Sequence, residues 1–194
     1  MWLHEVQHEI DDGDLLLFCG RSLFGRLIRC WSQSPYSHVA VVVWLWIGGE
    51  RRPCVFEAVE GPGVRLCPLA NYLIERQGRN EAVDWYQIVD PAIERHLVIV
   101  HLLSTWGQAY ASVWQFVVSF TWLGRLWRKL TARPLALNDR RPFCSWHAAA
   151  ALMLAGFVPD AGLPANPAET TPGDVARFTC LRRRGPLMAN IGDS

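Results

Sequence analysis

The sequence predicts an α+β fold, because strand patterns fill its first half and helical patterns its second. Runs rich in β-branched and aromatic residues lie between residues 15 and 89, separated by turns that contain glycine or proline. Apolar residues at helical spacing follow from residue 91 onward. The chain has 194 residues, of which 51% are hydrophobic and 19% charged, which suits one domain with a substantial core. We therefore expect a single domain over residues 1–194, with an apolar helical insert at about 111–133.

The strands are expected in the order 15–18, 38–46, 53–59, 64–68 and 82–89. The run 38–46 is continuously β-branched and aromatic, which is typical of a buried central strand, and the turn at Gly48-Gly49 joins it to 53–59 as a hairpin. Helices are expected at 22–32, 68–77, 91–106, 110–130 and 143–156, with a last helical turn at 171–177. Leu23, Leu27 and Trp31 carry the pattern of the first helix, and Gly156 is a suitable C-cap for the fifth.

Composition excludes several classes of function. The formal net charge is +1, which gives no general attraction to nucleic acid. The arginine clusters, among them residues 182–184, are expected on solvated faces and loops. The six cysteines form no CxxC pair, and His4, His8, His96 and His101 have no shared ligand spacing, so neither a metal nor another cofactor is expected. The acidic first 14 residues do not resemble a signal peptide, and no apolar stretch is clearly long enough to cross a membrane. The default expectation is a cytoplasmic protein, with delivery elsewhere as an effector or phage protein left open.

The candidate nucleophile is Cys144, which lies where a proline-containing loop meets an Ala/Leu-rich helix. Bringing a thiol pKa from about 8.5 to about 6.5 requires roughly 2.7 kcal/mol. A helix N-terminus supplies only about 0.3–1 kcal/mol. A nearby histidine is therefore needed to hold Cys144 as a thiolate.

Two histidines compete for that role. His147 is three residues after Cys144 on the same predicted helix, where it has little freedom to reach a leaving group, so a structural role is expected for it. His38 opens the central strand and offers the better geometry, with Glu57 on the adjacent strand to orient its ring. A carboxylate among apolar neighbours is costly unless it is paired. The hypothesis is a triad of Cys144, His38 and Glu57.

The order of these motifs resembles the circularly permuted papain-like proteins of the NlpC type, with the YaeF/YiiX-like branch as the best match. The resemblance rests on four segments, 13–18, 36–41, 55–58 and 143–145, and extends to about residue 180. It implies a small antiparallel sheet packed against a helical layer that carries the nucleophile. It also implies that Cys144 is the nucleophile, His38 the general base and Glu57 its orienting residue. The Cys144 backbone N–H would form part of the oxyanion hole, with Tyr36 as a candidate second donor.

The resemblance implies a cysteine peptidase or amidase that cleaves an amide or ester through a thioester intermediate. The expected substrate is a small peptide, a cell-wall fragment or a lipid, and the apolar insert is a candidate contact with a membrane surface. An acyltransferase of the lecithin-retinol type and a non-catalytic binding module of the same fold remain alternatives. Trp146, His147 and the insert depart from the family pattern, which bears on the substrate more than on the nucleophile.

Overall fold

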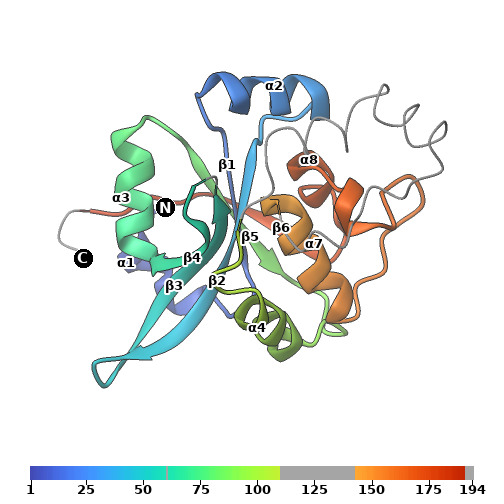
Figure 1. Cartoon of the computed structure of the whole chain (residues 1–194). Helices are drawn as coiled ribbons and strands as arrows, with labels where there is room; N and C mark the ends of the chain where they lie inside the picture. Colours follow the sequence, from blue (N-terminus) through green and yellow to red (C-terminus); the bar gives the residue numbers. More distant parts are fainter. Residues whose placement is uncertain (60, 110–142, 191–194) are drawn as a thin grey trace.

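A six-stranded antiparallel sheet is the centre of the α+β fold, with helices on both of its faces (Figure 1). The computed structural model describes residues 1–59, 61–109 and 143–190. The strand order is β4-β3-β2-β1-β5-β6. The strands are β1 (Leu15–Phe18), β2 (His38–Ile47), β3 (Glu50–Val59), β4 (Gly63–Pro68), β5 (Val83–Ile88) and β6 (Leu181–Pro186). The helices are α1 (Leu3–Val6), η1 (Gln7–Glu9), α2 (Leu23–Ser32), α3 (Leu69–Gly78), α4 (Arg95–Ser104), α7 (Cys144–Leu154), η2 (Pro167–Glu169) and α8 (Pro172–Val175).

The middle of the sheet is buried on both faces, because β1 and most of β2 are apolar, whereas the edge strand β6 is largely exposed. In β1, Leu15 and Leu17 belong to one core, whereas Leu16 and Phe18 belong to the other. The first core includes residues of α4 and α7, and the second includes residues of α1 and α3. The continuous apolar runs of β1 and β2 thus fill two cores at once.

Most elements agree with the sequence prediction to within a few residues. The strands expected at 15–18, 38–46, 53–59, 64–68 and 82–89 correspond to β1 to β5, and the cysteine helix corresponds to α7. The helix expected at 91–106 begins only at Arg95, because residues 91–93, which start with Pro91, form a turn. The helix expected at 110–130 and the insert at about 111–133 lie outside the described residues.

Residues 182–184 are exposed, as expected for arginines on a solvated face, but they lie in strand β6 and not in a loop. These arginines belong to an edge strand that pairs with β5, where Arg183 forms an ion pair with Asp84 at 3.0 Å and Arg184 forms one with Glu9. An edge strand rich in charged residues has no alternation of apolar and polar side chains. A search of the sequence for apolar runs therefore does not find β6.

Two further observations concern the cysteines and the described helices. All six cysteines are free thiols. Among the helices of residues 1–59, 61–109 and 143–190, none is both long and apolar enough to span a bilayer.

Candidate active site

Cys144 is the first residue of α7, which packs against β2 and α4. Phe143 is the N-cap residue in extended conformation, so the chain turns into the helix at the cysteine itself. The Ser145 hydroxyl donates a hydrogen bond of 2.7 Å to the Thr170 carbonyl and is fully buried, which fixes the first turn of the helix. The Cys144 side chain therefore lies at the positive end of the helix dipole in a defined place.

His38 is the first residue of β2, and its side chain is 12% exposed. The preceding residue anchors the entry of the strand: the Ser37 N–H donates to the Phe18 carbonyl at 2.9 Å, and its hydroxyl accepts from the Gly20 N–H at 2.7 Å. The Phe18 ring lies 4.7 Å from the imidazole, measured between centroids. These contacts hold the His38 ring at the strand terminus.

Glu57 shares one face of the β2–β3 hairpin with His38. It is opposite Ala40 in the register, and His38 is two residues from Ala40, so the two side chains are diagonal neighbours on one face. The distance between His38 Nε2 and Glu57 Oε2 is 3.1 Å, and Glu57 has no exposed surface. The structure thus brings together the two residues expected from the sequence.

Two arginines also bind Glu57, and sequence reasoning missed both of them. Arg65 on β4 donates to Oε1 from Nε at 2.8 Å and from a terminal nitrogen at 2.5 Å. Arg76 on α3 donates to Oε2 at 3.2 Å and to Glu81 at 3.1 Å. With His38, these donors give each oxygen of Glu57 two hydrogen bonds, which satisfies a buried carboxylate.

Both arginines had a signal in the sequence. The turn at Gly61-Pro62-Gly63 sets Arg65 directly opposite Glu57 once the hairpin is written out in register. Arg76 completes the buried stripe Leu69, Tyr72, Leu73, Arg76 at helical spacing. A cation at such a position needs a buried anion, and Glu57 is that anion.

Burial alone would raise the pKa of Glu57, but its donors outweigh burial. The hydrogen bond and charge of His38, followed by Arg76 and Arg65, lower the pKa of this carboxyl to about 2. Glu57 is therefore an anion throughout the neutral range, and it always accepts from His38 Nε2.

The Cys144 sulfur and the His38 imidazole form a hydrogen-bonded pair. Since Nε2 of His38 bonds to Glu57, Nδ1 is the nitrogen left for the sulfur. Burial opposes charge on both groups, but their mutual attraction prevails: the pKa of Cys144 is lowered and that of His38 is raised to about 9. The backbone N–H groups of Val39 and Ser145 further lower the pKa of the thiol. The arrangement shifts the pair toward thiolate and imidazolium.

His147 takes no part in this cluster, as expected from the sequence. Its Nε2 lies 2.6 Å from the Thr105 hydroxyl, which itself donates to the Leu102 carbonyl at 2.8 Å. Burial, followed by the His101 ring at 5.7 Å between centroids, lowers the pKa of His147 to about 3. His147 is therefore neutral, and its hydrogen bond with Thr105 joins α7 to the C-terminal end of α4.

Tyr36 does not suit the role of second oxyanion donor in this conformation. Its hydroxyl donates to Asp84 Oδ2 at 2.5 Å and accepts from Tyr86 at 3.1 Å. Because a phenol has a single proton to give, none is left for a substrate oxygen.

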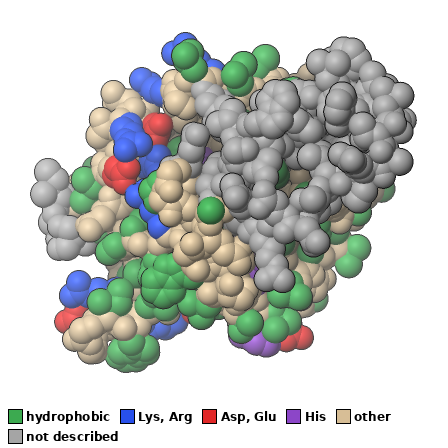
Figure 2. All heavy atoms as spheres, in the orientation of Figure 1, with side chains coloured by type: hydrophobic (Ala, Val, Ile, Leu, Met, Phe, Trp, Pro, Cys, Tyr) green, Lys and Arg blue, Asp and Glu red, His purple; other side chains and the backbone are tan. Residues whose placement is uncertain are grey.

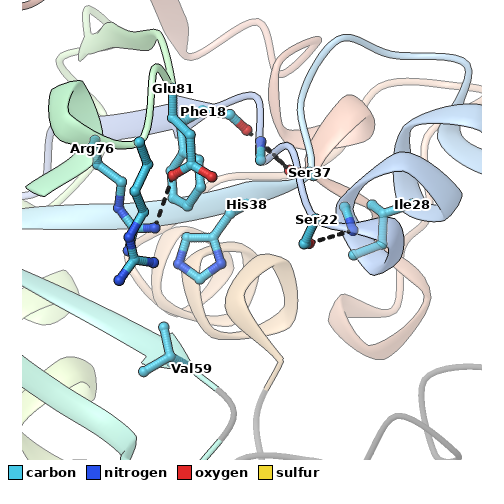
Figure 3. A pocket seen from close by; sticks show the side chains of 12 residues that line it. Phe18, Ser22, Ile28, Ser37, His38, Val59, Arg76 and Glu81 are labelled. Atoms are coloured by element: carbon cyan, nitrogen blue, oxygen red, sulfur yellow. Dashed lines mark hydrogen bonds and ion pairs between the residues drawn. The ribbon is translucent and has the colours of Figure 1, made fainter.

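A cavity of about 190 Å³ opens beside His38. Figure 3 shows the imidazole between the Arg76–Glu81 pair on one side and Ser22 and Ile28 of α2 on the other. Val59 closes a further side. The cavity gives small groups a place next to the imidazole, and α2 forms one of its walls.

One solved structure shares the fold over almost the whole chain. It is described as the metalloprotein YiiX from Escherichia coli O157:H7, DUF1105, with a TM-score of 0.60 and 17% sequence identity, over 92% of this chain and 98% of that one. No family model matches the sequence, and no curated protein matches it. The chain therefore has a YiiX-like fold.

The description of YiiX as a metalloprotein prompts a test of the residues present here. Within the described ranges, no three His, Cys, Asp or Glu side chains come together in a way that could hold a metal ion. Both Glu57 oxygens are taken by donors, and two guanidinium groups beside them repel a further cation. The side chains around Cys144 therefore do not fit a metal ion.

Proposed function

We propose that this protein is a cysteine hydrolase that cleaves an amide or ester through a thioester on Cys144. The observation that carries the proposal is the chain of contacts from the sulfur to His38 and from His38 to a fully buried, anionic Glu57. This is the arrangement that activates a nucleophilic thiol in papain-like enzymes, which the order of the motifs resembles. The YiiX-like fold agrees with this resemblance at the level of the fold.

Acylation begins with attack of the Cys144 thiolate on the substrate carbonyl carbon. A C–S bond forms, and the carbonyl electron pair moves to oxygen, where the Cys144 backbone N–H at the start of α7 stabilises it. His38 then gives its Nδ1 proton to the leaving amine or alcohol as the C–N or C–O bond breaks. Glu57 holds the ring through Nε2 during this transfer.

Deacylation uses the same groups in reverse. Neutral His38 removes a proton from water, and the resulting hydroxide attacks the thioester carbonyl. The C–S bond breaks, the carboxylic acid leaves, and the thiolate–imidazolium pair is restored. Arg65 and Arg76 keep Glu57 anionic during both steps. The Nε2 proton of His38 therefore stays on the imidazole and does not pass to the carboxylate.

The proposal is tested by intact-mass spectrometry after exposure to activated acyl esters and to acyl-peptide amides. We expect an acyl adduct on Cys144 that turns over in the wild-type protein, no adduct in Cys144→Ala, and an unchanged adduct in His147→Gln. Absence of any adduct from both substrate sets would favour a binding module. Transfer of the acyl group to an added amine or alcohol in preference to water would indicate an acyltransferase.

A further inference from the structure

Helix α2 exposes a continuous apolar stripe. Leu23, Leu27 and Trp31 are four residues apart, so they cover only about 80° of the helix circumference at roughly 100° per residue. Leu23 is 79% exposed, Leu27 67% and Trp31 45%. Three large apolar side chains in one line differ from the single exposed apolar residues that are normal on a protein surface.

The opposite face of α2 fixes the direction of this stripe. Ile28 is buried, and a side chain at Gly25 would place its Cβ 2.8 Å from the Gly20 carbonyl oxygen. The Ser22 hydroxyl caps the helix by accepting from the Gly25 N–H at 3.0 Å. Because α2 contacts the loop after β1 so closely, it cannot rotate to hide its leucines.

Two exposed arginines lie beside the stripe, and the nearest carboxylate is Glu81, which accepts from the Arg21 backbone N–H at 3.3 Å and also pairs with Arg76. Arg21 precedes the helix and Arg26 flanks the stripe, and both are exposed. No aspartate or glutamate occurs between Asp14 and Glu50, so no acidic side chain of this segment offsets them. Figure 2 shows blue and green side chains mixed along the top edge of the molecule, where α2 lies in Figure 1.

We propose that α2 docks this protein on a lipid bilayer that carries anionic headgroups. Leucines and a tryptophan on one side with arginines at the flank are the pattern of an interfacial helix: the apolar stripe enters the headgroup region and the guanidinium groups bind lipid phosphates. Trp31 suits the interface because its ring is apolar and its N–H is polar. An acidic protein partner would match the arginines equally well, but it would give no reason for an uninterrupted leucine stripe without polar positions.

Docking through α2 brings the cavity beside His38 to the bilayer. Ser22, Gly25 and Ile28 line that cavity, so the helix that enters the lipid is also a wall of the site. It follows, resting on the function proposed above, that the acyl substrate is an amide or ester of a membrane lipid. The docking itself does not depend on the chemistry of Cys144.

The test is co-sedimentation with vesicles of phosphatidylcholine alone and of phosphatidylcholine mixed with phosphatidylglycerol. We expect binding to the mixed vesicles, a decrease of about tenfold or more in Leu23→Ser/Leu27→Ser, and a similar decrease in Arg21→Gln/Arg26→Gln. The matched control is Val158→Ser/Val100→Ser, which removes exposed apolar side chains elsewhere (80% and 56% exposed) and should bind as the wild type does.

Three results would overturn docking: no binding of the wild type to mixed vesicles, equal binding by the Leu23/Leu27 variant, or a dimer in solution that this variant dissolves. Cys144→Ala separates the two proposals. If this variant and the wild type bind vesicles equally while the wild type forms no acyl adduct, the docking stands and the proposed hydrolase fails.

Discussion

Two histidines lie close to the start of the cysteine helix, His38 on the neighbouring strand β2 and His147 within α7 itself, and their pKa values are shifted in opposite directions. His38 pairs with the Cys144 sulfur and Glu57, and its pKa is raised to about 9. His147 is one turn into the same helix as the cysteine, bonds to a hydroxyl, and has its pKa lowered to about 3. Burial lowers the pKa of both groups, so burial does not explain the contrast.

The difference lies in the charge of the partners. Around His38 there are two groups that become anions, Cys144 and Glu57, and the second is kept anionic by two arginines. Around His147 the partners are a neutral hydroxyl and a second imidazole, His101. Proximity in sequence would favour His147 as the partner of Cys144. The charges around His38, however, make His38 the histidine that favours ionisation of the thiol.

The largest expected effect comes from removing the anion at the centre of that network. Glu57→Gln removes the buried carboxylate that Arg65 and Arg76 share, and leaves Arg76 with Glu81 and Arg65 with the more distant Glu75. Breaking a buried ion pair in this way costs about 3–5 kcal/mol. We expect a decrease of that size in the free energy of unfolding, measured by urea denaturation.

The matched control for this variant is Glu75→Gln. Glu75 also pairs with Arg65, at 3.7 Å, but its side chain is 36% exposed. Glu75→Gln should lower the free energy of unfolding by less than about 1 kcal/mol, because a partly exposed ion pair contributes little. Equal losses in the two variants would mean that the buried network around Glu57 is not the stabilising unit.

The next effect is the loss of folding stability in acid, to which His147 and Glu57 contribute in different pH ranges. The pKa of His147 is lowered from 6.5 to about 3 in the folded protein, so the unfolded chain takes up this proton first and stability is lost as pH falls from about 6.5 toward 3. Glu57, lowered from 4.5 to about 2, adds its own loss only below about 4.5. Between pH 6.5 and 4.5 the His147 contribution is on the order of 3 kcal/mol.

The free energy of unfolding, measured from pH 7 to pH 4.5, checks this assignment. His147→Gln should flatten the slope across this window, whatever its effect on absolute stability. An unchanged slope in this variant would show that His147 is not held neutral by burial.

The smallest effect on stability is expected at the tie between α7 and α4. Thr105→Val removes the hydroxyl that contacts His147 and leaves a buried ring nitrogen unpaired, at a cost of about 1–3 kcal/mol. The rate of Cys144 alkylation in this variant should stay within about twofold of the wild type, because His147 does not ionise the thiol. A large decrease in that rate would show that the contact between His147 and Thr105 influences the ionisation of Cys144.

The sequence was sufficient for the apolar elements and insufficient for the charged ones. Strands β1 to β5 follow from apolar runs and turns, whereas β6 is an arginine-rich edge strand without such a pattern. In the site, Cys144, His38 and Glu57 were expected from residue type and position. Arg65 and Arg76 were missed because each contacts Glu57 only through strand register or helix docking.

The oxyanion hole illustrates a second limit of sequence reasoning. Tyr36 is close to His38 in the chain, which made it a candidate donor, but its hydroxyl is committed to Asp84, 48 residues away. A hydrogen bond to a distant strand depends on the assembled sheet, and residue spacing does not contain that information.

The central claim is that His38, and not His147, ionises Cys144, and alkylation with iodoacetamide at pH 6 tests it directly. Mass spectrometry of the digested protein follows all six cysteines in one sample. We predict that Cys144 reacts faster than the other five in the wild type, that His38→Gln slows it by at least about tenfold, and that His147→Gln leaves it within about twofold. Equal rates in the wild type and His38→Gln, or a loss confined to His147→Gln, would contradict the account.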